Sequence, residues 1–279
     1  MYNLQIIYES IKFIEDNLKN PLTVKKVADK IGYSLFHFSR MFNSIVKHSP
    51  YDYIMRRRLS EAAKDLIKTD KKIIDIALDY QFNNHETFSR AFNKMFNILP
   101  HRVKKNNISN LILKTKDTYD YLKYLNKTHQ FIPKITKLDK IYLVGFTLMF
   151  SELDNNLNTL LENLKKKSSI IRNRIIPEKY YLIQSRSKNN YNFKMLGVET
   201  NSIDETPDNF VGKIIPTNKY LIFIHNGKYN EINFTLNYIY QTWMPKSNCI
   251  INRNYELLYF NNKNIDNSNL KIDIFIPIK

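Results

Sequence analysis

The sequence predicts a chain of two structural classes, an all-α region over roughly the first 105 residues and an α+β region after it. In the first region apolar residues recur every three or four positions, which is the spacing of amphipathic helices. Further along, the apolar residues form short alternating runs rich in strand formers. A third observation is a repeat, because FSRMFNSIVKHSP, which starts at Phe38, returns as FSRAFNKMFNILP from Phe88.

Length and composition favour two globular domains of a cytoplasmic protein. The chain has 279 residues, of which 43% are hydrophobic, so it can bury two cores. A single cysteine, Cys249, excludes a disulfide framework and fits a reducing cytosol. No apolar run approaches the ~20 residues of a membrane span, so we expect no membrane association. The net charge of +17 favours a polyanionic partner, although the basic residues are spread over the whole chain.

Caps and breakers divide the first region into helices. The opening helix ends at Asn20, before a proline. Thr23 and Ser34 are the expected N-caps of the next two helices, and Gly32 lies in the turn between them. The expected helical segments are 1–20, Thr23–Ile31, Leu35–Val46, Tyr51–Lys68, Ile73–Leu78 and Asn84–Phe96.

The second region is predicted to consist of strands interrupted by two helices. The expected strands lie in 141–150, 179–187, 219–227, 255–260 and 270–278, and the expected helices are Asp154–Lys167 and Tyr229–Thr242. Strand, helix and strands in the same order twice predict a duplicated strand-helix-strand-strand unit. The predicted domains are therefore residues 1–107 and 133–279, with a partly helical connector over 108–132.

Each copy of the repeat lies in the second helix of a predicted helix-turn-helix pair. The shared phenylalanines stand four positions apart on the buried side, whereas Arg40 and Arg90 lie between them and point outward. In such a pair the second helix enters the DNA major groove. The long helix between the pairs would let one monomer read two adjacent grooves, roughly 34 Å apart. The other reading is a helical bundle whose arginines form surface ion pairs, worth about 0–1 kcal/mol each.

Two stretches carry a resemblance to a known family: LTVKKVADKIGYSLFHFSRMFNSIVKHSPYDYIMRRRLSEAAKDLI and IIDIALDYQFNNHETFSRAFNKMFNILPHRVKK. Residues 7–105 resemble the DNA-binding region of AraC/XylS-type transcription regulators. The resemblance implies base or phosphate contacts from both units. Together with the outward positions of the two helices, it makes the expected DNA-binding residues Phe36, Ser39, Arg40, Asn43, Lys47, His85, Glu86, Ser89, Arg90 and Lys94.

Three positions depart from the pattern of that family. Lys47 and Asn97 stand where the family usually has a glycine before its turn, and Gln81 replaces the glycine of the second unit's turn. A left-handed backbone suits asparagine better than lysine. Because no core phenylalanine or outward arginine is lost, we expect the fold to survive these departures.

The linking helix carries three consecutive arginines, Arg56, Arg57 and Arg58. The family resemblance implies that the first of them help with packing or with phosphate contact. From the residues alone, a solvated helix face that pairs with Glu61 and Asp65 is favoured.

The runs FIHNGKYNEI, IYQTWMP, YELLYF and DIFIPI carry a second resemblance. Residues 220–277 resemble the gyrase-inhibitor-like (GyrI-like) effector-binding domain. The resemblance implies a cleft that holds an apolar, often cationic, ligand, and with it a role in multidrug response.

Glu256 argues for such a ligand independently of any resemblance. Strand alternation places it with Leu258 on one face of an apolar run, where a buried carboxylate is costly unless a cation compensates it. Trp243 and Tyr229 offer stacking or cation–π surfaces. The expected effector-binding residues are therefore Glu256, Trp243, Tyr229 and Leu258. The other reading pairs Glu256 with an internal lysine or arginine, or places it at a solvated edge, and leaves Trp243 in the core.

Catalysis has little support in the sequence. No phosphate-binding glycine loop, HExxH or GxSxG is present, and the six histidines lack metal-ligand spacing. We therefore expect no catalytic residue, no metal and no cofactor. His225 with Glu256 is the one acid/base pair that an enzyme reading would use.

The sequence as a whole predicts a cytoplasmic transcription regulator. Its expected partners are double-stranded DNA, RNA polymerase and a small-molecule effector, and two reading heads in one chain allow it to act as a monomer on DNA. The alternatives are a C-terminal domain that docks a protein partner, and a small-molecule-modifying enzyme fused to a DNA-binding domain.

Overall fold

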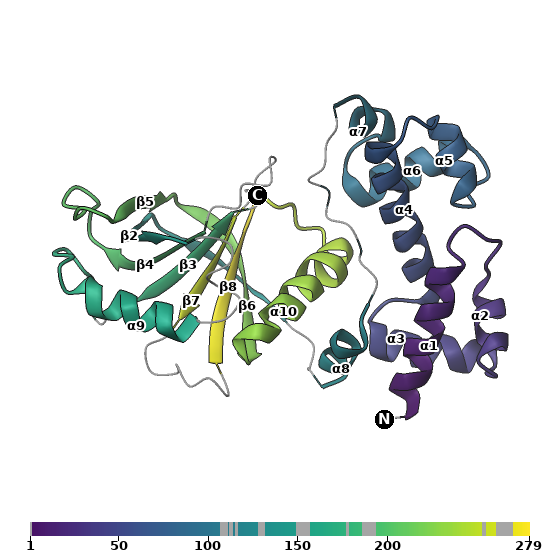
Figure 1. Ribbon diagram of the computed structural model, residues 1–279, viewed down its shortest axis with the longest axis horizontal. Helices are drawn as coiled ribbons and strands as arrows, with labels where there is room; N and C mark the ends of the chain where they lie inside the picture. Colours follow the sequence, from purple (N-terminus) through teal and green to yellow (C-terminus); the bar gives the residue numbers. More distant parts are fainter. Residues whose placement is uncertain are drawn as a thin grey trace. The chain divides into compact units, whose positions relative to one another are not determined.

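The computed structural model divides into two compact units, each with its own hydrophobic core (Figure 1). The first unit comprises Met1–His129 together with Asn237–Ser247, and the second comprises Gln130–Leu236 with Asn248–Lys279. The structure describes residues 2–106, 111, 114, 117–127, 132–148, 157–176, 179–185, 194–252, 255–260 and 270–279.

The first unit is built from helices. They are α1 (Tyr2–Asp16), α2 (Val24–Lys30), α3 (Leu35–Val46), α4 (Pro50–Lys68), α5 (Ile73–Asp79), α6 (His85–Phe96), α7 (Pro100–Asn106) and α8 (Tyr119–Lys127). The six predicted helices are confirmed, although α1 ends at Asp16 rather than at Asn20. The prediction of helix in the connector matches α8. The seven-residue α7 was not predicted, because it is too short to show an apolar period.

Side chains cap the starts of these helices as the sequence indicates. Thr23 accepts a hydrogen bond from the backbone N–H of Lys26, and Ser34 accepts one from His37. Asn84 does the same for Thr87 at the start of α6. Each cap satisfies a donor that the first helical turn would otherwise leave unpaired.

Helix α4 connects two hydrophobic clusters. Its first half contributes Tyr53 and Ile54 to a cluster with the phenylalanines of α3. Its second half contributes Leu59 and Leu66 to a cluster with the phenylalanines of α6. In Figure 1, α4 runs from the group α1–α3 to the group α5–α7. The linking helix is thus the shared wall of both helix-turn-helix cores.

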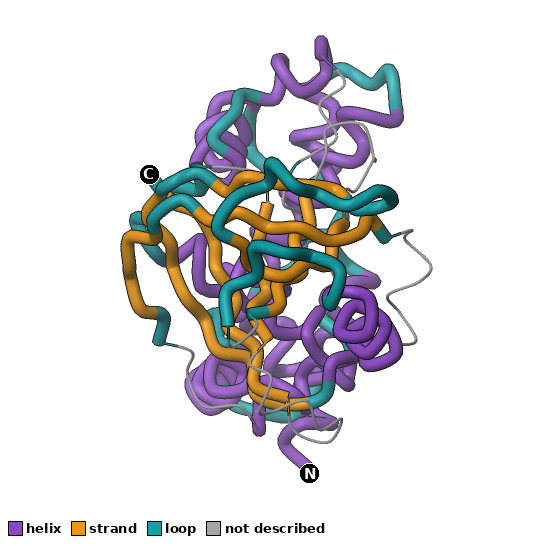
Figure 2. Tube along the Cα trace, turned by 90° about the vertical axis from the view of Figure 1, so that its left-hand side faces the viewer, coloured by secondary structure: helices purple, strands orange, loops and turns teal. Residues whose placement is uncertain are grey.

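The second unit contains one curled antiparallel sheet, whose strands are orange in Figure 2. The strand order is β1-β6-β8-β7-β3-β4-β2-β5, and every pair in it is antiparallel. The strands are β1 (Lys134–Leu138), β2 (Ile141–Thr147), β3 (Tyr180–Ser185), β4 (Lys194–Thr200), β5 (Val211–Ile215), β6 (Asn218–Gly227), β7 (Tyr255–Phe260) and β8 (Leu270–Ile278).

Five of these strands were predicted, and three were missed. The missed strands are β1, β4 and β5, in which lysines, a glutamate and glycines interrupt the apolar runs. The helix predicted from Asp154 is α9 (Leu157–Ser168), and the start of the prediction lies outside the described residues. The helix predicted from Tyr229 is present as a short 3₁₀ turn, then α10 (Ile232–Tyr238), then a π-helical stretch, Ile239–Trp243.

The sheet order contains the same arrangement twice. In β2–α9–β3–β4 the third strand lies between the first and second, and in β6–α10–β7–β8 it does so again. A duplication would produce this order, and the duplication itself stays a prediction.

Helices α9 and α10 cover the same face of the sheet. Lys165 of α9 lies over the ring of Tyr180, and Thr235 of α10 hydrogen-bonds His225. Tyr180 pairs with Phe260 and His225 with Ile272, and Phe260 also pairs with Ile272. Directly paired residues share a face of a sheet, so all of them lie under the helices.

Candidate functional site

The surface of interest in the first unit is formed by the outer sides of α3 and α6. On α3, Phe36 and Arg40 are exposed, and on α6 Arg90 is exposed. The whole predicted set is exposed or half-buried: Phe36, Ser39, Arg40, Asn43, Lys47, His85, Glu86, Ser89, Arg90 and Lys94. Behind this surface the phenylalanines that both copies of the repeat share are fully buried: Phe38, Phe42, Phe88 and Phe92. The arrangement leaves donors and acceptors free to meet a ligand, and each residue's role stays a prediction.

Neighbouring side chains order parts of this surface. The guanidinium of Arg40 lies over the ring of Phe36, with 5.3 Å between its carbon and the ring centre. Such a cation–π contact restricts the arginine and is worth about 0.5–1 kcal/mol at an exposed site. On α6 the hydroxyl of Ser89 lies 3.5 Å from Nε2 of His85.

The three departures from the family pattern all have a left-handed backbone. The φ angle is +64° at Lys47, +64° at Gln81 and +54° at Asn97. Lys47 and Asn97 end α3 and α6, where their backbone N–H groups return to Asn43 and Asn93. The positions where the family favours glycine therefore keep the conformation that glycine favours, with other residues in them.

The consecutive arginines of α4 have mainly a packing role. The solvated-face reading is wrong for Arg57 and Arg58, since their exposed fractions are 4% and 7%. Arg58 donates to the carbonyls of Leu18 and Asn20, which lie in the turn after α1. Arg56, by contrast, bonds Asp52 one turn earlier on α4.

Arg57 is the centre of a buried ionic cluster. It donates two hydrogen bonds of 2.8 Å to Glu15 of α1, one of 2.7 Å to Glu61 and one to the carbonyl of Lys114. Burial opposes its charge, yet the hydrogen bonds and negative charge of Glu15 hold the pKa of Arg57 above its ordinary value. The predicted pairing with Glu61 is present, but inside the unit and not on a solvated face.

In the second unit, Glu256 is a buried carboxylate on the face covered by the helices. Its exposed fraction is 2%, and its strand partner Gln184 donates a 2.7 Å hydrogen bond to Oε1. Leu258 is two residues along the same strand and is buried on the same face. The reading that placed Glu256 at a solvated edge is therefore wrong.

The other two predicted effector residues lie elsewhere. Tyr229 is half-buried in the turn before α10, and Trp243 is half-buried in the π-helical stretch, which belongs to the first unit. Only Glu256 and Leu258 are placed side by side within one strand.

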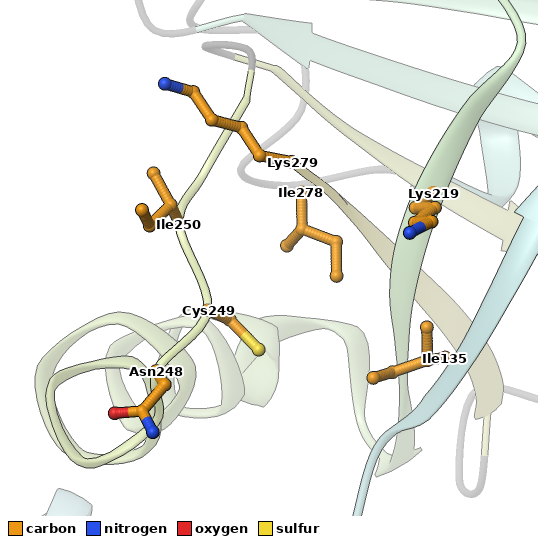
Figure 3. Close-up of a pocket in the computed structure, with 7 residues that line it drawn as sticks. All are labelled: Ile135, Lys219, Asn248, Cys249, Ile250, Ile278 and Lys279. Atoms are coloured by element: carbon orange, nitrogen blue, oxygen red, sulfur yellow. The ribbon is translucent and has the colours of Figure 1, made fainter.

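A cavity of about 310 Å³ lies at another part of the second unit (Figure 3). Cys249 and Ile278 point into it, and Ile135 of β1 closes one side. Its further lining residues are Lys219, Asn248, Ile250 and Lys279. None of the predicted effector residues lines this cavity.

The residues of the enzyme reading do not form an acid/base pair. His225 is fully buried, with Nδ1 2.6 Å from the hydroxyl of Thr235 and Nε2 3.1 Å from the carbonyl of Lys228. Burial lowers the pKa of His225. Both ring nitrogens thus face structural partners. Within the described residues no group of acids, histidines and cysteine has the arrangement of a metal site, and no helix has the length and apolarity needed to cross a membrane.

Two known family models match this chain, one in its N-terminal part and one in its C-terminal part. Residues 27–106 match a family model described as a helix-turn-helix domain, and residues 134–278 match one described as an integron-associated effector binding protein. Among solved structures, the integron cassette protein VCH_CASS2 of Vibrio cholerae aligns with 53% of this chain and 95% of its own, at 13% identity and a TM-score of 0.36.

The similar curated proteins include transcription regulators. The chain is 35% identical over 102 residues to the multiple antibiotic resistance protein MarA of Escherichia coli, which covers 37% of this chain and 80% of MarA. It is 43% identical over 95 residues to the transcriptional regulator Rob of Salmonella typhimurium, covering 34% of this chain but only about a third of Rob. The chain therefore belongs to the AraC-type family of helix-turn-helix transcription regulators, in a form that carries a GyrI-like effector-binding domain.

Proposed function

We propose that this regulator reads two adjacent major grooves of duplex DNA, with α3 in one and α6 in the next. The observation that carries the proposal is the matched pair Arg40 and Arg90, each exposed at the same point of its helix. An exposed arginine in this place suits bidentate hydrogen bonds to guanine.

The dimensions of α4 support this reading. At ~1.5 Å per residue its 19 residues span roughly 28 Å, close to the roughly 34 Å between successive grooves on one DNA face. A monomer then suffices for a two-part site. RNA polymerase is the partner through which a regulator at such a site would act.

The two arginines provide the test. Arg40→Ala and Arg90→Ala should each cost about 1–3 kcal/mol of DNA-binding free energy and relax the base preference in one half of the site. Sites are first selected from random DNA with the wild-type protein, and affinities and footprints are then measured. Arg172→Ala is the matched control, since Arg172 is exposed in the second unit. Normal binding and unchanged footprints for both variants would refute the proposal.

We further propose that a cation with an apolar body binds at the face that carries Glu256. Glu256 is a buried carboxylate, and the amide of Gln184 holds it in position. At a buried site a carboxylate attracts an opposite charge more strongly than it does in water. A cationic ligand would supply the opposite charge, and the apolar neighbours on β7 would contact its body.

Glu256→Gln tests the charge while it keeps the side chain's shape. The variant should weaken binding of lipophilic cations and spare neutral molecules of equal size. The measurement is isothermal titration calorimetry with each ligand. Leu258→Ala is the companion variant, because it should weaken both ligand classes. Equal affinity of wild type and Glu256→Gln for the cations would exclude the charge pairing and favour a hydrophobic or protein-docking site.

A further inference from the structure

The turn between α3 and α4 is held by a segment 193 residues away in the sequence. His48 lies in this turn, and its exposed fraction is 1%. Its Nδ1 is 2.7 Å from Oδ2 of Asp52, on the first turn of α4. Its Nε2 is 3.2 Å from the hydroxyl of Thr242 and 3.2 Å from the carbonyl of Gln241. One imidazole therefore joins α4 to a segment from the far end of the chain.

The protonation state of His48 fixes the direction of these hydrogen bonds. Burial lowers the pKa of His48, so the ring is neutral at pH 7. Burial acts to raise the pKa of Asp52, but the hydrogen bond from His48 and the charge of Arg56 bring it down to about 2. Asp52 is thus a carboxylate that only accepts. Nδ1–H of His48 donates to it, and Nε2 accepts from the hydroxyl of Thr242. In this tautomer the carbonyl of Gln241 lies next to Nε2 without receiving a hydrogen bond from it.

A second contact reaches the neighbouring residue of the turn. The ammonium group of Lys246 donates to the backbone carbonyl of Lys47. Lys47 is the left-handed residue that ends α3, where helix carbonyls carry partial negative charge. The same distant segment therefore makes two contacts. Its ammonium group offsets the partial negative charge at the end of α3, and its threonine hydroxyl bonds the ring of His48, the next residue.

The segment has an unusual backbone. Asn237–Ser247 belongs to the first unit, although it lies inside the sequence range that matches the effector-binding family. It continues α10 as the π-helical stretch Ile239–Trp243, and Gln241 and Thr242 are in its middle. Short π-helical insertions are rare and are frequent at functional sites.

We propose that Gln241–Lys246 is a docking element for the first helix-turn-helix unit, and that His48 is the positioning residue through which it sets the α3–α4 turn and thereby α3. The proposal rests on the proposed reading of DNA by α3. It adds that a stretch within the effector-domain sequence supports α3, and that DNA binding by α6 does not depend on this stretch.

The test compares full-length His48→Gln, Thr242→Val and the double variant on the selected DNA site. Thr242→Val keeps the side-chain shape and removes the hydroxyl that donates to His48. Thr242→Val should lose about tenfold in affinity, in line with one buried hydrogen bond. His48→Gln should lose at least as much, because it also alters the contact with Asp52. The double variant should lose less than the sum of the two single losses, because both changes remove the hydrogen bond between His48 and Thr242. Protection in footprints should weaken in the half of the site that Arg40→Ala affects, and stay intact in the other half.

Fluorescence supplies a readout that a loss of general stability would not move. Trp243 follows Thr242 directly, so DNA binding should change its emission in the wild type and not in Thr242→Val. The matched control is Thr235→Val, which removes a buried hydroxyl from the same helix where it bonds His225 instead. That variant should bind DNA with wild-type affinity.

The outcomes separate the two proposals. Normal binding by Arg40→Ala would overturn the reading of DNA by α3, whatever His48 does. If Arg40→Ala is impaired but Thr242→Val binds as well as Thr235→Val, or if losses in the double variant are additive, the docking element is overturned and the reading of DNA stands.

Discussion

At the scale of single residues, three turn positions have the left-handed backbone that glycine favours, although none of them is a glycine. Lys47, Gln81 and Asn97 all have positive φ angles at positions where related regulators usually have glycine. A left-handed conformation costs a residue with a Cβ atom roughly 1–2 kcal/mol, less for asparagine. Gln81 recovers part of this by donating to the carbonyl of Lys19. These turns are therefore specified by the surrounding fold as much as by their own residues.

Asn97 is a suitable position at which to measure the free-energy cost of a left-handed backbone. Asn97→Ala should lower the free energy of unfolding by about 1 kcal/mol, and Asn97→Gly should maintain or raise it, because only the alanine variant strains the turn. The measurement is urea unfolding followed by circular dichroism. Asn83→Ala is the control, since Asn83 is exposed and its φ is not positive. A stability of Asn97→Ala equal to that of the control variant would contradict the strain.

At the scale of elements, α4 is more than a spacer. It carries the apolar residues of both cores and, through Arg57, a buried ionic cluster that ties it to α1. The same arginine donates to the carbonyl of Lys114, and the N–H of Lys114 donates to Ser60. Lys114 itself is buried and pairs with Asp117. Lys114, which follows α7 in the sequence, therefore packs against α4.

Removal of one partner should show that this cluster is structural. Arg57→Ala should destabilise the protein by about 3–5 kcal/mol, because Glu15, whose side chain is 10% exposed, would lose its positively charged partner. Thermal unfolding at pH 7 measures the effect. Arg57→Met with Glu15→Met should recover much of the loss, since the uncompensated charge is removed as well. Lys64→Ala, which breaks a more exposed pair with Glu61, should cost about 0–1 kcal/mol. A loss of that small size for Arg57→Ala would contradict the assignment.

At the scale of the whole molecule, the net charge of +17 gives DNA binding a dependence on salt. Phosphate contacts release condensed counterions, so affinity falls as salt rises. The basic residues are spread through both units, and only those at the reading surface should contribute to the slope.

Lys94 allows the effect of a lysine at the proposed DNA-binding surface to be separated from the effect of the overall net charge. Lys94→Ala should reduce the slope of log affinity against log salt by about 1 and leave base preference unchanged, as expected for one phosphate contact. Lys213→Ala removes the same charge from an exposed position of the second unit and should leave the slope as it is. Equal slopes for the two variants would show that Lys94 makes no phosphate contact.

The sequence by itself determined the parts of this protein that depend on nearby residues. Periodic apolar residues and the capping side chains of Ser34 and Asn84 define α3 and α6, and the repeat places Arg40 and Arg90 on their outer sides. Strands β7 and β8 were predicted to the residue, because aromatic residues in the first and isoleucines at every second position of the second dominate each run. Such signals lie within a few positions of each other along the chain.

Only the tertiary structure decided the contacts between residues far apart in sequence. Nothing near Arg57 indicates that Glu15 will bury it, and nothing near His48 indicates that Thr242 will bond it. Strands β1 and β5 have weak patterns of their own and pair at the two edges of a sheet that other strands define. The burial of Glu256 likewise follows from helices that cover its face. The physical reason is that the energies of burial and pairing depend on which distant side chains the fold brings together. A pattern of neighbouring residues carries no information about those distant partners.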